Sequence, residues 1–135
     1  AGPARIVLGR HAGAHSRVAA PEGMNLLHVR LAAGERWRYQ PPAGHDVAWT
    51  HVHRGGLLVA GDRLQGELAV FDESNSAIDF TAEGDTDFIV GSAVKHPHDL
   101  VLGYYSVHTS PEALQRGEAE IARLGRQLRA DGRIR

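Results

Sequence analysis

The stretch VAWTHVHRGGLLVAGD, residues 47–62, decides the fold class of this chain. Its first eight residues read as a β-strand, in which residues i and i+2 share a face. Two glycines follow, then the apolar run LLVA, and a Gly-Asp pair ends that run. Breaks of this kind separate short strands. The stretch therefore predicts two consecutive strands, at residues 47–54 and 55–62.

Short strands with turn residues between them continue in both directions from this stretch. Further strands are predicted at residues 5–9, 24–34, 35–40, 66–72, 77–82, 85–93 and 100–106. Residues 11–18 are small and polar and predict a loop, and PPAGHD, residues 41–46, predicts a turn. In residues 35–40 the alternation places Trp37 and Tyr39 on one face. Regular short strands without intervening helices predict an all-β antiparallel barrel or sandwich.

The last part of the chain has the period of a helix. Apolar or small residues recur there at steps of three and four: Leu114, Gly117, Ile121, Leu124 and Leu128. Ser110 is a suitable N-cap before Pro111, and Gly132 a suitable stop. We expect residues 1–109 to form the barrel and residues 110–132 the helix, in a single domain overall. The apolar stripe of the helix must pack on this barrel, on a missing N-terminal domain or on a second copy.

Charge and cysteine content exclude several classes of protein. Lys and Arg total 15 against 16 Asp and Glu, a formal net charge of -1. Nucleic-acid and anionic-membrane surfaces need a basic excess, so neither partner is predicted. The absence of cysteine excludes disulfides and thiolate metal sites and fits a cytoplasmic location. The chain opens at Ala1 and enters its first strand almost at once, so we expect it to be part of a longer protein.

His51 and His53 are the first candidates for chemistry. They share one face of the predicted strand. Two such imidazoles, with a carboxylate and a third imidazole, form a site for iron, nickel, manganese or zinc. The carboxylate is missing, because leucines occupy the positions where it is needed. The favoured interpretation is that this chain has no metal, cofactor or catalytic residue.

Three alternatives remain open. In the first, a small metal-dependent enzyme uses His51 and His53 with His98 or His96. In the second, a metal-free barrel binds a ligand in an apolar cavity lined by Trp37, Tyr39, Trp49, His51 and His53. In the third, Ser106 and His108 form a hydrolytic pair oriented by Asp99. No G-x-S-x-G nucleophile elbow surrounds Ser106, which favours a simple strand before the helix.

Several segments together resemble the C-terminal cupin domain of pirin-like proteins, which contain two barrels. RIVLGRHAG, residues 5–13, resembles the opening strand and loop of that second barrel, and residues 26–74 resemble its central strands. AIDFTAEGDTDFIVGSA, residues 77–93, resembles the strand pair that follows them. LVLGYYSVHTSPEAL, residues 100–114, occupies the place of the segment before the C-terminal helix. The resemblance therefore covers nearly the whole chain.

The resemblance implies a cupin-type jelly roll, and it implies that only one of the two barrels binds a metal. In the family the metal lies in the N-terminal barrel, in a His-x-His-Arg-Gly-x-Glu pattern. Here HVHRGGL has Leu57 at the position of the glutamate, so the ligands of the family carry over onto no residue of this chain. The resemblance implies a metal-free domain with a structural or interaction role beside a metal-bearing N-terminal cupin, in a quercetin 2,3-dioxygenase-like enzyme or a regulator. A homo-oligomer is a further expected partner.

Overall fold

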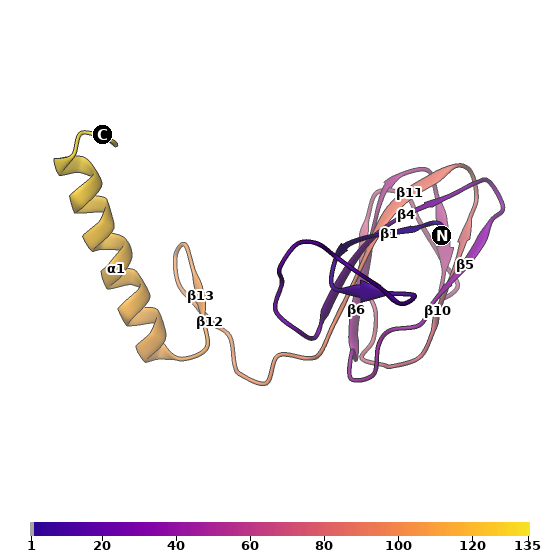
Figure 1. The fold of residues 1–135 in the computed structure, drawn as a ribbon, viewed down its shortest axis with the longest axis horizontal. Helices are drawn as coiled ribbons and strands as arrows, with labels where there is room; N and C mark the ends of the chain where they lie inside the picture. Colours follow the sequence, from indigo (N-terminus) through magenta and orange to yellow (C-terminus); the bar gives the residue numbers. More distant parts are fainter. Residues whose placement is uncertain (1) are drawn as a thin grey trace. The chain divides into compact units, whose positions relative to one another are not determined.

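The computed structural model describes residues 2–135, which divide into two compact units, residues 2–95 and residues 96–135. We call them the sandwich unit and the helical unit (Figure 1). Residues 96–109, which the sequence assigned to the barrel, group with the helix.

Two antiparallel sheets form the sandwich unit. The larger sheet has the order β1-β4-β11-β6-β9 and the smaller one β5-β10-β7-β8. The larger sheet comprises β1 (Ala4–Leu8), β4 (Met24–Leu31), β6 (Val47–Arg54), β9 (Leu68–Val70) and β11 (Thr86–Ala93). The smaller sheet comprises β5 (Arg36–Tyr39), β7 (Leu57–Val59), β8 (Asp62–Leu64) and β10 (Ile78–Ala82). The prediction of an all-β antiparallel architecture with one C-terminal helix is confirmed.

The core lies between the two sheets and is built from alternate residues of each strand. The strand β4 buries every second residue, as does most of β6. The largest fully buried side chains are Tyr39, Phe80, Phe88 and Leu27. Trp37 stacks on Tyr39 and on Phe80 at 5.7 Å between ring centroids in each case, so Trp37 and Tyr39 share the inward face as predicted. Burial of such a cluster is the main contribution to the stability of the unit.

Two short hairpins differ from the sequence-based prediction. Residues 11–18, expected to form a loop, contain all but Arg10 of the hairpin of β2 (Arg10–His11) and β3 (Ala14–His15). Residues 63 and 64, to which the sequence assigned no element, join Asp62 in β8, which pairs with β7. In both hairpins an Ala-Gly pair has positive φ at each residue: 47° and 80° at Ala12 and Gly13, and 51° and 87° at Ala60 and Gly61. Two successive positive φ values are typical of the type I′ turn, which is usually recognised from Asn-Gly or Asp-Gly.

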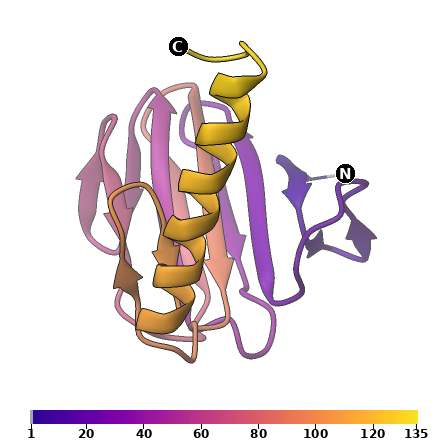
Figure 2. The same ribbon diagram turned by 90° about the vertical axis from the view of Figure 1, so that its left-hand side faces the viewer.

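The helical unit combines a small hairpin with the helix α1 (Pro111–Ala130). The hairpin of β12 (Val101–Leu102) and β13 (Val107–His108) lies beside the first half of α1 (Figure 2). It replaces the single strand predicted at residues 100–106. The Ser110 side chain accepts a hydrogen bond from the backbone N–H of Ala113, at 3.1 Å, and so caps the helix as predicted. Gly103 and Gly117 leave room for Leu114 and His108 respectively, because a Cβ at either glycine would overlap those side chains.

The apolar stripe of α1 stays accessible in this structure. No residue of α1 is buried, and Ile121 and Leu124 are exposed. What the stripe packs on therefore stays a prediction. None of the helical segments described is both long enough and apolar enough to cross a membrane.

Asp87 forms the most shielded ion-pair cluster among the described residues. Its carboxylate accepts from His28 Nε2 at 2.6 Å and from Arg30 Nε at 3.0 Å, on the outer face of the larger sheet. Burial raises the pKa of Asp87, but the hydrogen bonds and charges of His28 and Arg30 outweigh that effect and lower the pKa overall.

Replacing Asp87 should destabilise the sandwich unit in a pH-dependent way. A depressed carboxyl pKa stabilises the folded state above the unfolded value, near pH 4, and that stabilisation is lost as the pH falls below it. We expect Asp87→Asn to lower the free energy of unfolding by about 2 kcal/mol at pH 7, and the difference from wild type to shrink toward pH 3. Urea denaturation at both pH values measures this. Asp79→Asn, which breaks the exposed Arg38–Asp79 pair, should change little; equal effects of the two variants would contradict the assignment.

Candidate functional site

His51 and His53 lie on the outer face of the larger sheet. Along β6 the buried residues are Ala48, Thr50 and Val52, so the histidines, at the alternate positions, point away from the core. His51 is partly buried and its Nδ1 lies 3.2 Å from the Glu67 carbonyl oxygen; His53 is exposed. The two imidazoles share one face, as predicted, but it is not the face that looks into the sandwich.

The residues do not fit the metal site that the resemblance to metal-bearing cupins would require. Within residues 2–135, no three His, Asp or Glu side chains come together in a group that could hold a metal ion. Leu57, at the position of the glutamate, is fully buried in the apolar core. The other candidate ligands, His96 and His98, belong to the helical unit, where the His98 backbone N–H donates to His96 Nδ1 at 3.4 Å. We therefore derive no chemistry through a metal.

The five predicted cavity-lining residues divide between two faces. Trp37 and Tyr39 lie in the packed aromatic core. Trp49, like His51 and His53, lies on the outer face of β6, where its indole covers Gly91: a Cβ there would approach Trp49 to 2.4 Å. Side chains inside the sandwich and side chains on the outer face of the larger sheet cannot line one cavity, because the sheet itself lies between them.

Ser106 and His108 are brought together, within the helical unit. His108 Nε2 lies 2.9 Å from Ser106 Oγ, and the ring packs over Gly117. In the described chain no carboxylate forms an ion pair with His108, so Asp99 does not act as the orienting group. The pair has a hydrogen bond without the third member that fixes a catalytic imidazole.

A polar chain of side chains lies at one end of the sandwich interior. Asn25 accepts from the Arg10 backbone N–H at 2.9 Å and donates to the Arg10 carbonyl at 2.8 Å. Its Nδ2 also lies 3.1 Å from the Tyr39 hydroxyl, which lies 2.7 Å from Ser92 Oγ. Ser92 Oγ in turn lies 2.9 Å from His45 Nδ1. All four side chains belong to buried residues, and no buried side-chain nitrogen or oxygen of the described residues lacks a partner.

The donor directions along these four hydrogen-bonded side chains indicate which ring nitrogen of His45 carries the proton. The double hydrogen bond to Arg10 orients the Asn25 amide, so its NH₂ group donates to Tyr39. When the Tyr39 hydroxyl donates to Ser92 and the Ser92 hydroxyl donates to His45 Nδ1, every hydroxyl hydrogen of the four side chains has an acceptor. This arrangement favours a neutral His45 with its proton on Nε2. Desolvation lowers the pKa of His45, and the positive charge of Arg10 lowers it further against a smaller opposite effect of Asp46, so the neutral form is favoured.

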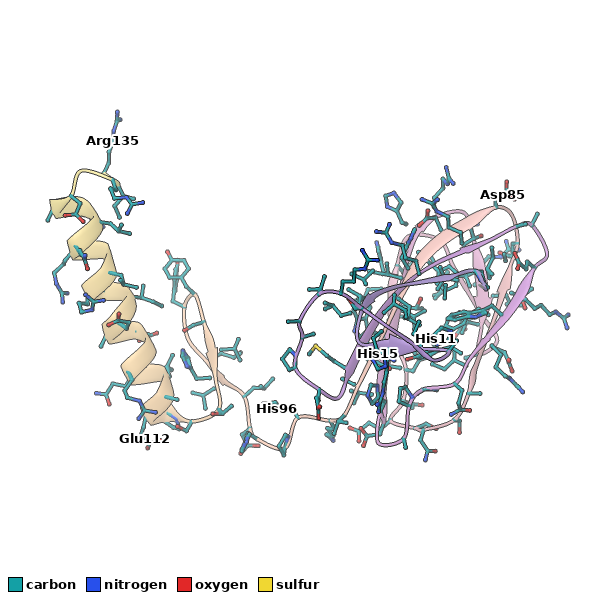
Figure 3. All side chains as sticks on the ribbon, in the orientation of Figure 1. His11, His15, Asp85, His96, Glu112 and Arg135 are labelled. Carbon is teal, nitrogen blue, oxygen red and sulfur yellow. The ribbon has the colours of Figure 1, made fainter. Side chains whose placement is uncertain are left out.

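A cavity of about 410 Å³ adjoins His45 and is formed by residues of the sandwich unit alone. Its polar lining includes Arg10, His15, Glu22 and His45, and its apolar lining includes Val18, Met24 and Val94. His45 Nε2 has no hydrogen-bond partner in residues 2–135, although no fully buried polar atom there is unpaired. Nε2 is therefore accessible, and the ring lines the cavity. His11 and His15, from the β2–β3 hairpin, lie close together at this end of the unit (Figure 3).

Sequence reasoning missed this site, although part of its signal was readable. Asn25 shares a face with Leu27 and Val29, and Ser92 shares one with Phe88 and Val90. A polar residue on an otherwise apolar strand face indicates a buried hydrogen-bonded network. No sequence spacing points to His45, because its partner Ser92 lies 47 residues away along the chain.

Comparison with known proteins shows similarity in structure but not in sequence. No family model matches the chain, and no curated protein matches it. A solved structure of quercetin 2,3-dioxygenase from Acinetobacter baumannii superposes with a TM-score of 0.79 at 20% identity, over 89% of this chain and 42% of that one. The bacterial pirin YhhW from Escherichia coli, in complex with nickel(II), superposes with a TM-score of 0.54 at 18% identity, over 69% of this chain and 40% of that one.

These similarities confirm the fold expected from the resemblance to pirin-like cupins. At 20% and 18% identity they carry the fold alone. The chain spans about two fifths of the length of both solved chains.

His45 should titrate as an imidazole with a lowered pKa. We expect its NMR titration midpoint below the ordinary value of about 6.5, and Arg10→Gln to raise it, because a nearby positive charge is removed. At pH 8, long-range ¹⁵N correlation spectra should show the proton on Nε2. The control variant is Arg36→Gln, at an exposed residue of β5 away from this site. A proton on Nδ1, or a midpoint unmoved by Arg10→Gln, would contradict the proposed chain of donors.

Proposed function

We propose that this domain is the metal-free cupin module of a pirin-like protein and that it docks against a metal-bearing cupin domain of the same polypeptide. The observation that carries the proposal is the composition of the interior. The inward positions of β6 are Ala48, Thr50 and Val52, and the residues paired with them on β11 are Ser92, Val90 and Phe88. None of these side chains suits a transition metal, and the histidines point outward.

The outer face of the larger sheet supports a docking role. One row of paired residues across four strands consists of Leu26, Gly91, Trp49 and Val70. The next row contains Ile89 and Leu68 beside His28 and His51. Val70 is 76% exposed and Leu68 is 61% exposed. A contiguous apolar patch on a sheet face is typical of an interaction surface.

A second cupin domain is the occupant that the comparisons favour. Each of the two superposed structures is more than twice as long as the matched region. In this proposal the complete protein contains two cupin domains and is a quercetin 2,3-dioxygenase-like enzyme or a regulator, with its metal in the other domain. In this proposal His51 and His53 contribute ring surface at the rim of the docking face.

The first test is the metal content of the purified chain and of the protein encoded by the complete gene. We expect the chain alone to contain well under one equivalent of iron, nickel, manganese or zinc, and the complete protein to contain about one. Plasma mass spectrometry after dialysis measures both, with circular dichroism to show that the chain is folded. A stoichiometric metal on this chain, lost in His51→Ala/His53→Ala, would overturn the proposal. So would a complete gene without a second cupin domain.

The second test places a charge on the docking face of the complete protein. Val70→Glu should uncouple the two cupin domains, because a carboxylate would be buried without a partner. Scanning calorimetry should then show two separate unfolding transitions instead of one. Leu58→Glu, at an exposed residue of the smaller sheet, is the matched control and should leave one transition. A single transition in both variants would contradict docking through this face.

A further inference from the structure

We propose that the cavity beside His45 is a binding site for a small organic carboxylate, held by Arg10 and His45. The proposal does not depend on the docking role, because the docking face and this cavity use different side chains. It starts from the shape of the site: a volume of about 410 Å³ lies within the range of small-molecule pockets.

His45 supplies a donor that the protein itself leaves unused. The residue is only 5% exposed, and its Nδ1 is occupied by Ser92. The remaining nitrogen, Nε2, carries the proton and has no partner in the described chain. Because no fully buried polar atom within residues 2–135 is unpaired, Nε2 is accessible from the cavity, where a ligand with an acceptor oxygen can take its hydrogen bond. The rigid chain from Asn25 through Tyr39 and Ser92 keeps the imidazole in this orientation before a ligand arrives.

Arg10 supplies the charge. Its backbone is clamped by both hydrogen bonds to Asn25, and its side chain forms no ion pair with any described residue. Its charge acts on His45, whose pKa it lowers. Arg10 and His45 line the same cavity, and a guanidinium together with a neutral N–H donor suits a carboxylate, which can accept from both.

The rest of the lining selects against a bare inorganic ion. Val18, Met24 and Val94 offer apolar surface to a carbon skeleton. Glu22 also lines the cavity and is exposed, so it disfavours a second negative charge on the ligand. The fitting ligand is therefore a monocarboxylate with an apolar body rather than phosphate or a dicarboxylate.

Benzoate is the probe for this site, and benzamide is its neutral counterpart. We expect benzoate, titrated into the ¹⁵N-labelled chain at pH 7.5, to shift His45 Nε2 and the amides of Gly23 and Asn25 saturably, with a Kd of about 1 mM or tighter. Benzamide should bind at least about tenfold more weakly, since it lacks the charge that pairs with Arg10.

Substituting two exposed arginines, one in the cavity lining and one outside it, distinguishes binding at this site from a general effect of the protein's charge. Arg10→Gln should weaken benzoate binding at least about tenfold, whereas Arg36→Gln, on β5 and outside the cavity lining, should leave it unchanged. Glu22→Gln should preserve or tighten binding. The proposal is overturned by the absence of saturable shifts up to about 50 mM benzoate, by equal affinity for benzamide, or by an Arg10→Gln variant that binds as wild type does.

Discussion

The placement of Tyr39 is the constraint on which the rest of the sandwich unit depends. Its ring belongs to the aromatic core and stacks on Trp37, so the whole residue is buried. A buried hydroxyl needs hydrogen-bond partners, because water cannot reach it. Asn25 and Ser92 supply these partners from the two central strands, and Ser92 in turn meets His45. The polar end of the interior follows from one buried phenol.

The buried position of Asn25 beside Tyr39 also determines part of the cavity lining. Asn25 uses its remaining capacity to hold the backbone of Arg10, which anchors the β2–β3 hairpin against β4. Gly9, with φ of 81°, precedes this contact, and a Cβ there would approach Asn25 Oδ1 to 2.1 Å. A side chain at that position would displace the clamp. The two hydrogen bonds between Asn25 and the Arg10 backbone therefore hold part of the cavity lining in place.

Periodicity predicted the strands and the helix well, because burial on one face repeats every two or 3.6 residues. It could not tell which face of β6 is buried. The set Ala48, Thr50 and Val52 on one side and the set Val47, Trp49 and His51 on the other each mix apolar and polar residues. The choice depends on the facing strands: Phe80 and Phe88 fill the interior, so the smaller side chains of β6 turn inward. The candidate site was harder still, since its members come from the segment before β6 and from four strands, β2, β4, β5 and β11, that are far apart in sequence.

The two faces of the larger sheet therefore carry separate properties. On β4, β6 and β11 the inward residues make the core and end in the Asn25–Tyr39–Ser92–His45 chain, while the outward residues make an apolar surface crossed by Trp49. Alternation keeps the two sets apart, so a change at an outward residue leaves the inward chain of donors intact. The proposed docking surface outside and the polar pocket at one end therefore use different side chains, and substitutions can test each of them separately.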